Sequence, residues 1–453
     1  MKRHSIVVRL NPADKTKVTV RDKGSHITTL HFVDGDRRLN HGLGQMLDQL
    51  SDRAMYPSEN AIDLAILAAT VIGADTRISR TTDSQDSWTR EIDLYIPVSE
   101  PDVWSENASL IERTLRFLTG DHWRIEFRAR QKNMKSLIDR PPELVGATFD
   151  SVCLFSGGLD SFVGAIDLLA EGKNPILVSH YRDASTKSQE ICAKRLGHTY
   201  GDMGPRHVRA NVGFDKNDMP GLGSETTTRG RSFIFFALAS LAASSLNGTT
   251  PLYVPENGLI SLNVPLDPLR LGAWSTRTTH PFYMARWQDL LDNLGINAKL
   301  LNPYRFKTKG EMLSECKNQS FLKKNISITI SCSSVTKGRW KGLPPGHCGH
   351  CTPCLIRRAS VIAAFGSDAT DYSIPDLTAQ KLNAKQAEAS NVRAFQMMSH
   401  RISKHPGIAN TLVHKTGPLS DYSAKEIAEY AAVFRRGIEE VGALVDDVVI
   451  EAA

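Results

Sequence analysis

The sequence predicts an α/β protein with a doubly wound parallel sheet at its centre. Strand-like and helix-like segments alternate between about residues 145 and 303, which is typical of a parallel sheet that carries helices on both faces. Before that stretch the two patterns are mixed, and after it they are helical. We therefore expect an N-terminal α+β domain over 1–142, a central domain over 143–366 and a C-terminal helical region over 367–453.

The composition is that of a folded protein. Of its 453 residues, 41% are hydrophobic and 23% are charged, which argues against wholesale disorder. The 55 Lys and Arg residues against 49 Asp and Glu leave a net charge of +6. Because so small an excess does not predict a nucleic-acid partner, we do not expect one.

The sequence also indicates a cellular compartment. The first residues show no apolar core of a secretory signal, and the longest apolar run, 233–243, is shorter than the ~20 residues of a membrane span. The seven cysteines are odd in number and four of them crowd near residue 350, unlike a disulfide scaffold. We expect a cytoplasmic protein without a membrane partner.

Residue spacing predicts the individual elements. In the N-terminal domain, alternating apolar and polar residues predict strands at 6–10, 90–98 and 123–130, and helical spacing predicts helices at 61–74 and 108–118. Pro141 and Pro142 then interrupt the chain. In the central domain the expected strands are 151–155, 175–181, 207–212, 251–258 and 297–303. The expected helices are 161–172, 186–199, 232–246, 281–294 and, near the C-terminus, 425–449.

A glycine-rich loop, SGGLDS at 156–161, lies between the first central strand and its helix. Its two glycines let backbone N–H groups approach an anion, and the start of a helix adds unpaired donors, so the pattern predicts phosphate binding. Asp160 is better suited to hold Mg²⁺ or to cap the helix than to face phosphate. The alternative is a plain glycine-rich turn, and the string matches neither GxxxxGK[ST] nor GxGxxG.

SGGLDS resembles the signature of the PP-loop ATP pyrophosphatases. The resemblance implies a PP-loop (HUP-type) sheet, cleavage of ATP between the α and β phosphates, and activation of a carbonyl or carboxyl oxygen as its adenylate. The residues that it implies for ATP binding are Phe155, Ser156, Gly157, Gly158, Leu159, Asp160 and Ser161.

Four cysteines form a second motif, C-x15-C-x2-C-x2-C, made by Cys332, Cys348, Cys351 and Cys354. Four thiolates at this spacing suit a tetrahedral structural Zn²⁺. An iron–sulfur cluster and disulfides are the alternatives. His347 and His350 are interpreted as flanking residues. The net charge of −2 on such a site can be offset by nearby basic residues: Lys337, Arg339, Lys341, Arg357 and Arg358.

The two motifs together resemble the 7-cyano-7-deazaguanine synthases (QueC family), which convert 7-carboxy-7-deazaguanine to its nitrile with ATP and ammonia. The likeness covers about residues 145–365. It implies zinc at the four cysteines and catalytic roles for Asp160, Arg231, Lys307 and Lys309. Solvated charges at helix ends are the alternative for Arg231 and the two lysines.

The chain differs from the short enzymes of that family. After the second central strand only Tyr181 matches the family's pattern, in the stretch 179–183, and the short enzymes have no counterpart of 1–140 or 370–453. The segment 255–281 and the added regions are similar to the longer QueC-like proteins of bacterial anti-phage defence operons, the QueC-like component of the Qat system in particular. That resemblance implies adenylating chemistry redirected to a macromolecular acceptor.

Further substrate residues are expected at the carboxyl end of the fourth central strand, where ligands of open α/β sheets gather. Glu256 and Asn257 leave that strand, and Arg277 and His280 follow in a polar stretch. They are suited to bind a carboxylate or to move a proton. An ordered surface loop is the alternative.

Three functions follow as hypotheses. The first is an ATP-dependent, zinc-containing ligase that adenylates a carboxylate of a deazaguanine-type substrate for attack by ammonia or by an amine of an operon partner protein, in anti-phage defence. The second is a tRNA-modifying PP-loop thiolase or ligase. The third is a non-catalytic scaffold of a defence complex. The expected cofactors are ATP, Mg²⁺ and Zn²⁺.

Overall fold

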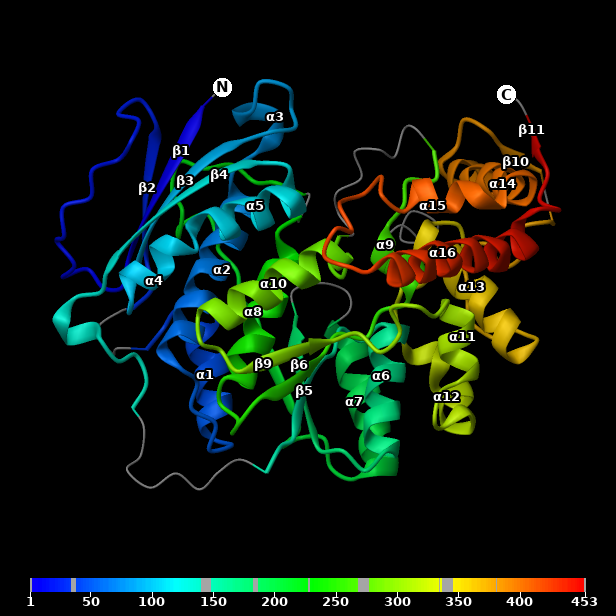
Figure 1. The fold of residues 1–453 in the computed structure, drawn as a ribbon, viewed down its shortest axis with the longest axis horizontal. Helices are drawn as coiled ribbons and strands as arrows, with labels where there is room; N and C mark the ends of the chain where they lie inside the picture. Colours follow the sequence, from blue (N-terminus) through cyan, green and yellow to red (C-terminus); the bar gives the residue numbers. More distant parts are fainter. Residues whose placement is uncertain are drawn as a thin grey trace.

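A computed structural model describes residues 2–33, 38–139, 148–181, 186–226, 229–267, 277–333, 335, 345–379 and 381–451. It contains a four-stranded and a five-stranded parallel sheet with helices between them (Figure 1). A second group of helices, formed mainly by the C-terminal region, carries a two-stranded parallel sheet. The fold is therefore α/β, as the sequence predicts. No helix in these ranges is long and apolar enough to cross a membrane.

The central sheet has five strands in the order β7-β6-β5-β8-β9, and every neighbouring pair is parallel. The order reverses between β5 and β8, as in doubly wound nucleotide-binding sheets. All five strands lie where the sequence predicts them: β5 Ser151–Leu154, β6 Pro175–His180, β7 His207–Ala210, β8 Thr250–Tyr253 and β9 Ala298–Leu301.

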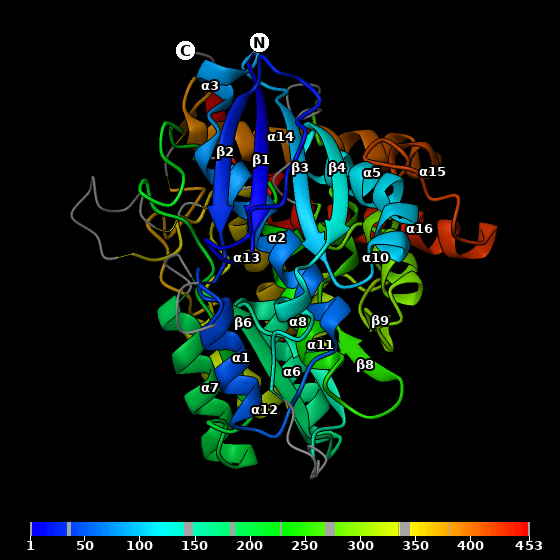
Figure 2. The same ribbon diagram turned by 90° about the vertical axis from the view of Figure 1, so that its left-hand side faces the viewer.

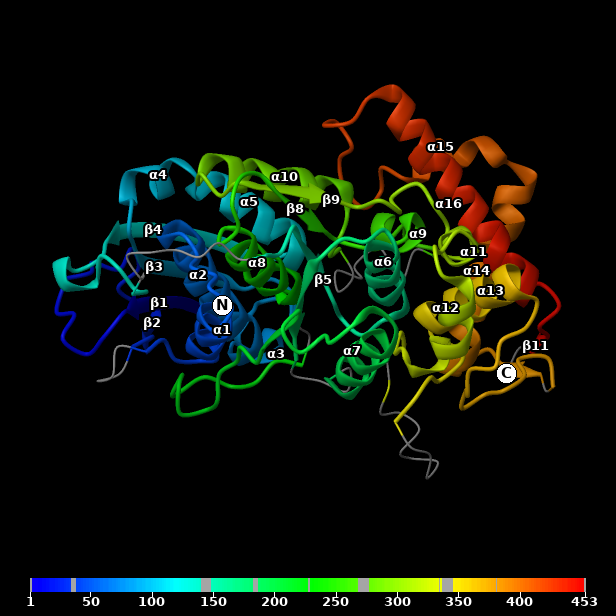
Figure 3. The ribbon, with the colours of Figure 1, turned by 90° about the horizontal axis from the view of Figure 1, so that it is seen from below.

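The two faces of this sheet belong to different hydrophobic cores. Val152 and Leu154 of β5 point into one core with α8, while Cys153 and Phe155 point into the other with α6. This follows from the two-residue period of a strand, and Figure 3 shows α6 and α7 on one side of β5 and α8 on the other. The connecting helices are α6 Leu159–Ala170, α7 Thr186–Tyr200, α8 Arg231–Ala243, α9 Gly258–Leu262 and α10 Pro281–Asn293.

The N-terminal region also folds around a parallel sheet, in the order β2-β1-β3-β4 (Figure 2). The expectation of an α+β domain was wrong, since this region is α/β as well. The sequence did not predict parallel strands here, because parallel strands are usually joined by a helix. Residues 10–25, which join β1 to β2, contain none. The strand β2, which is short and half exposed, was not predicted. The elements are β1 Arg3–Arg9, β2 His26–His31, α1 Leu43–Ser51, α2 Glu59–Arg77, α3 Arg80–Asp83, β3 Glu91–Val98, α4 Pro101–Glu106, α5 Ala108–Thr119, β4 His122–Ala129 and the short helix Lys132–Met134.

One hydrophobic core runs from the N-terminal sheet to the central sheet. The helix α2 contacts both β3 and α8, and α8 packs in turn on β5, β6 and β8. Residues on both sheets therefore belong to the same cluster. The expected boundary at 142/143 falls in 140–147, outside the described residues.

The C-terminal helices bury a core of their own against α9 and α13. The helix α16 covers most of the predicted 425–449 helix, and its packing partner α14 adds to the helical region that the sequence predicts. These elements are α11 Lys309–Ser314, α12 Gln319–Asn325, the short helix Ile326–Ile328, α13 Thr352–Phe365, β10 Leu382–Asn383, α14 Ala387–Lys404, the short helix Pro406–Ile408, α15 Ala409–Leu412, α16 Ala424–Val445 and β11 Ile450–Glu451.

Candidate functional site

The candidate site lies at the carboxyl edge of the central sheet, between β5 and β8. The glycine loop joins β5 to α6, and Glu256 and Asn257 join β8 to α9. Lys309 follows β9 and begins α11. A reversal of strand order opens a crevice at this edge in doubly wound sheets, which makes it the usual position of a ligand.

The glycine loop has a conformation that requires glycine at one position. Gly157 has φ +77°, and a Cβ there would lie 2.8 Å from the backbone nitrogen of Gln189 in α7. The loop therefore packs directly on the first turns of α7. The Ser188 hydroxyl donates a hydrogen bond of 2.7 Å to the Gly157 carbonyl oxygen, so α7 holds the loop by both packing and a hydrogen bond.

The serines of the motif hold the loop from within. The Ser156 N–H donates to the Ser161 hydroxyl oxygen at 3.2 Å, and the Ser161 hydroxyl donates to the Gly158 carbonyl oxygen at 3.0 Å. The side chains of Phe155 and Leu159 lie in the hydrophobic core behind the loop. Those two residues would therefore meet a ligand through their backbone only.

Asp160 is the centre of a buried polar cluster. Its Oδ1 atom lies 2.7 Å from the Lys309 ammonium, and its Oδ2 atom accepts hydrogen bonds from the backbone and side chain of Asn257 at 3.1 and 2.7 Å. Burial alone would raise the pKa of Asp160, but the Lys309 ammonium and the hydrogen bond from Glu256 bring it below its ordinary value. Asp160 is therefore ionised at neutral pH.

Glu256 has the opposite protonation state. Burial of its carboxyl group and the neighbouring Asp160 carboxylate raise its pKa well above the ordinary value, although the Lys309 ammonium opposes this. The protonated carboxyl hydrogen-bonds Asp160. Two carboxyls and an ammonium thus share one site.

One other expected residue, Lys307, lies apart from this cluster. Lys307, two residues before Lys309, pairs with Glu315 on the surface. Arg231 begins α8, as expected, and the adjoining Gly230 N–H bonds Asp75 of α2.

The tyrosine after the second central strand lies at the same edge of the sheet. The Tyr181 N–H donates to the Ala210 carbonyl oxygen at 2.9 Å, and the Arg209 guanidinium lies 4.5 Å from its ring centre. Arg182 and Asp183, which distinguish this stretch from the family's pattern, lie outside the described residues, as does 268–276 of the 255–281 segment.

Arg277 and His280 make contacts that stabilise the fold. The Arg277 guanidinium donates to the Phe117 carbonyl oxygen at 2.9 Å, in the last turn of α5, where unpaired carbonyls favour a cation. His280 caps α10 by accepting the Phe282 N–H at 3.1 Å, and burial lowers its pKa to about 3. A neutral, buried cap is not placed to transfer protons.

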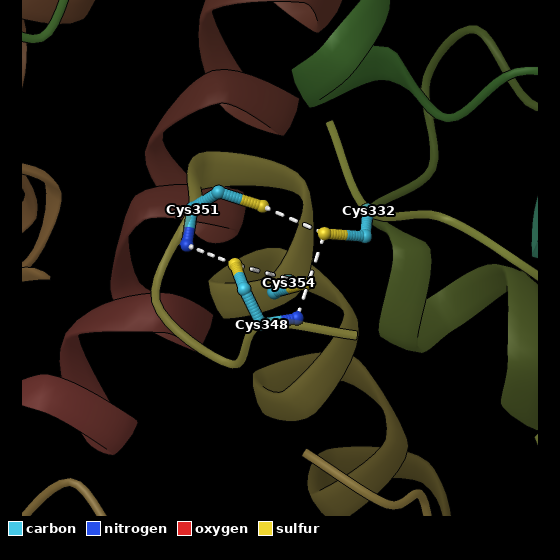
Figure 4. A group of neighbouring side chains, drawn as sticks. All are labelled: Cys332, Cys348, Cys351 and Cys354. Carbon is cyan, nitrogen blue, oxygen red and sulfur yellow. Dashed lines mark hydrogen bonds between the residues drawn. The ribbon is translucent and has the colours of Figure 1, made fainter. Parts of the chain in front are cut away.

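The four cysteines converge from three segments (Figure 4): Cys332 follows α12, Cys348 and Cys351 precede α13, and Cys354 lies in the first turn of α13. All four sulfur atoms lie within 4.8 Å of one another, and the Cys332–Cys351 and Cys348–Cys354 sulfur pairs are 3.9 Å apart. Tetrahedral Zn–S bonds of ~2.3 Å place sulfurs about 3.8 Å apart. The group can therefore hold a metal ion such as zinc, and these separations are too long for disulfide bonds.

Two arginines of α13 hydrogen-bond to segments near the cysteine cluster. The fully buried Arg357 donates to the Thr329 hydroxyl at 2.7 Å, and Arg358 donates to the Ile374 carbonyl at 2.9 Å. His347 accepts the Ser331 N–H at 3.2 Å and is a flanking residue, as expected. The other basic residues expected to offset the charge, Lys337, Arg339 and Lys341, lie outside the described residues.

The cysteine cluster and the glycine loop are joined by one short segment. The Ile330 N–H donates to the Gly157 carbonyl oxygen at 3.1 Å, and Cys332 follows two residues later. Sequence reasoning missed Ser188, Gln189 and Ile330. No local pattern marks them, because their role comes from contact with a loop distant in the chain.

No protein-family model, curated protein or solved structure matches this chain.

Proposed function

We propose that this chain is an ATP-dependent ligase of the PP-loop type, similar to the QueC family, that activates a carboxylate as its adenylate. One observation carries the proposal: the Asp160 carboxylate of the SGGLDS loop is paired with Lys309 at the reversal point of a doubly wound sheet. A buried ion pair is costly to a fold, and this one lies at the edge where doubly wound sheets bind their ligands, which supports a chemical role.

The proposed reaction has two steps. An oxygen of the substrate carboxylate attacks the α-phosphorus of ATP, the bond from that phosphorus to the bridging oxygen breaks, and pyrophosphate leaves with the electron pair. A nitrogen nucleophile then attacks the acyl carbon, AMP leaves, and the nitrogen loses a proton. The product is an amide, and the protein supplies no covalent nucleophile.

The residues at the site suit the charges of this reaction. Backbone N–H groups of 156–161 would bind the phosphates, and Lys309 would stabilise negative charge on the transferring groups. Asp160 and Glu256 offer two carboxyls, the set that Mg²⁺ uses together with phosphate oxygens and water. Mg²⁺ bound there would neutralise phosphate charge. Arg231, at the start of α8, is proposed to face the same phosphates.

Zinc is the proposed metal of the four cysteines. Sulfur atoms 3.9 Å apart leave room for a single ion between them, which favours Zn²⁺ over an iron–sulfur cluster. Cys332, Cys348, Cys351 and Cys354 would complete its tetrahedron and leave no open position for a substrate. The role of such an ion is structural.

The proposed substrate is 7-carboxy-7-deazaguanine or a related carboxylate, and the proposed acceptor is ammonia or an amine of an operon partner protein in anti-phage defence. The motifs at 156–161 and 332–354 support this proposal through their likeness to the QueC family. Tyr181, at the same sheet edge, is the proposed substrate contact. The Asn257 side chain, expected to be another, is fully buried: it bonds Asp160 and caps α9.

Mass spectrometry tests the proposal. The purified chain is incubated with ATP, Mg²⁺ and 7-carboxy-7-deazaguanine, with and without ammonium and the co-expressed operon partners. Release of AMP and pyrophosphate, with an amidated substrate or a covalent adduct on a partner, is the expected result. AMP release that depends on tRNA would favour a tRNA-modifying enzyme, and phage protection that survives Asp160→Ala would favour a scaffold.

A further inference from the structure

A partly buried carboxylate from the C-terminal region reaches the turn that carries Lys309. The Oε2 atom of Glu440, in α16, accepts a hydrogen bond of 2.7 Å from the Thr308 hydroxyl, and the Gly310 N–H lies 3.2 Å from both carboxylate oxygens. Its Oε1 atom accepts from the Ser360 hydroxyl of α13. Glu440 thus hydrogen-bonds the residues on both sides of Lys309 and links them to α13.

The packing at this contact leaves no room for a Cβ unless the Glu440 carboxylate shifts. A Cβ at position 310 would lie 2.4 Å from Oε2 of Glu440. The carboxylate therefore rests directly on the backbone of the turn. Any larger residue at 310 would push Glu440 or the turn away.

A neighbouring residue of α16 supports the same turn. Arg436, one helical turn before Glu440, donates from Nε to Oε1 of Glu311 at 2.6 Å and from Nη2 to the Phe306 carbonyl oxygen at 2.9 Å. The first turn of α11 therefore has two charged contacts to α16. Lys309 itself points the other way, to Asp160 at 2.7 Å.

The partial burial of the Glu440 carboxyl makes it depend on the hydrogen-bond donors around it. Burial raises the pKa of Glu440, while the hydrogen bonds from Ser360 and Thr308 oppose the shift. A buried carboxyl keeps its place only where such donors surround it. The three donors belong to α11, its cap and α13, so the carboxyl specifies how these elements meet.

We propose that Glu440 is a positioning residue, which holds the Thr308–Gly310 turn so that the Lys309 ammonium meets Asp160 in the glycine loop. The C-terminal helix α16 thereby completes the nucleotide site. The role of the pair in catalysis rests on the proposed function, whereas the positioning itself does not. The residues after 366 would then be needed for the chemistry of the central sheet.

The test measures amine acylation of Lys309 by mass spectrometry in the full chain. Lys309 is buried in its ion pair, so it reacts slowly, while Lys307, more exposed and two residues away, reports the reagent. We expect Glu440→Gln to raise the ratio of Lys309 to Lys307 labelling at least fivefold. Glu439→Gln, which removes one exposed charge from the same helix, should leave the ratio unchanged. Gly310→Ala is a second route to the same displacement.

The rate of AMP release is the second measurement. If the chain releases AMP, Glu440→Gln should lower kcat about tenfold and change KM for ATP less than twofold, because the lysine acts on charge that develops in the transition state. Unchanged Lys309 labelling in folded Glu440→Gln and Gly310→Ala proteins would overturn the positioning role, whatever the activity. Increased labelling in a chain that never turns over ATP would support positioning and reject the proposed function.

Discussion

The backbone N–H of Ile330 donates a hydrogen bond of 3.1 Å to the carbonyl oxygen of Gly157. Ile330 lies two residues before Cys332, so the segment that enters the cysteine cluster also supports the glycine loop. The Ser188 hydroxyl donates to the same oxygen. The loop is thus held by α7 on one side and by the cysteine segment on the other.

If the four cysteines bind a metal ion as proposed, its removal should loosen the glycine loop. We expect a chelator, or Cys348→Ser, to speed amide hydrogen exchange in 156–161 about fivefold, the equivalent of one net hydrogen bond of ~1 kcal/mol. Exchange mass spectrometry, together with metal content by elemental analysis, measures this. Cys316→Ala, which alters a buried cysteine outside the cluster, is the control. Equal exchange in 156–161 with and without metal would contradict the link.

The contact between Gly157 and Gln189 predicts the effect of an added methyl group. Gly157→Ala should lower the free energy of unfolding by ~1 kcal/mol for the positive φ and by a further 1–3 kcal/mol, roughly, for the clash with α7. Gly172 has the same φ of +77° and nothing within 4 Å of its Cβ position. Gly172→Ala should therefore show only the first loss. Urea unfolding of both variants separates the two effects, and equal losses would mean that the close packing costs nothing.

The Asp160–Lys309 pair predicts a pH-dependent loss of stability. Lys309→Met leaves a buried carboxylate without its cation, which we expect to cost about 3 kcal/mol of unfolding free energy at pH 7. Without the ammonium the pKa of Asp160 rises, because burial is then opposed only by hydrogen bonds. A protonated Asp160 carboxyl carries no charge and needs no cation. The stability lost in Lys309→Met should therefore shrink as pH falls toward 4.

The measurement is urea unfolding at several pH values. Lys307→Met, which removes a surface lysine two residues away, should change stability by less than about 0.5 kcal/mol. Both variants are then assayed for AMP release, and only Lys309→Met should abolish it. A Lys309→Met loss that stays constant between pH 7 and pH 4 would argue against an ionised Asp160.

The buried cap His280 predicts an acid-sensitive fold. Its pKa of about 3 in the folded protein lies below that of about 6.5 in an unfolded chain. Between those values only the unfolded state binds the proton, so stability falls as pH drops below 6.5. From pH 7 to pH 5 this one residue should remove about 2 kcal/mol.

His280→Asn keeps a side-chain acceptor for the helix and removes the titration. Its stability should therefore fall by about 2 kcal/mol less than that of the unaltered chain between pH 7 and pH 5. Chemical denaturation at the two pH values measures the difference. His198, exposed near the end of α7, provides the control variant His198→Asn, which should follow the unaltered chain. An identical pH dependence for both variants would show that His280 is protonated in the folded state.

Local patterns predicted most of the elements that build the site. The five central strands, the SGGLDS turn and the four cysteines are each marked within a few neighbouring residues, by apolar runs, glycine pairs or ligand spacing. Asp160 was singled out by the SGGLDS motif, Lys309 by the likeness to the QueC family, and Glu256 and Asn257 because they leave a strand of the sheet. The structure brings these four together, and leaves Lys307 on the surface.

The parallel N-terminal sheet, the capping roles of Arg277 and His280, and the contacts of Glu440 and Ile330 could not be predicted. Each depends on which segments meet across the fold. A polar residue in a loop has the same local sequence whether it faces a substrate or the end of a distant helix, as Arg277 does at α5.

The sequence by itself determined the alternation of strands and helices, the glycine loop and the metal-ligand spacing, because these depend on residues close together in the chain. Only the tertiary structure decided which charges are paired and which helices support the site. The reason is physical: burial and hydrogen bonding set the state of Asp160, Glu256 and Glu440, and both arise from segments separated by tens to hundreds of residues.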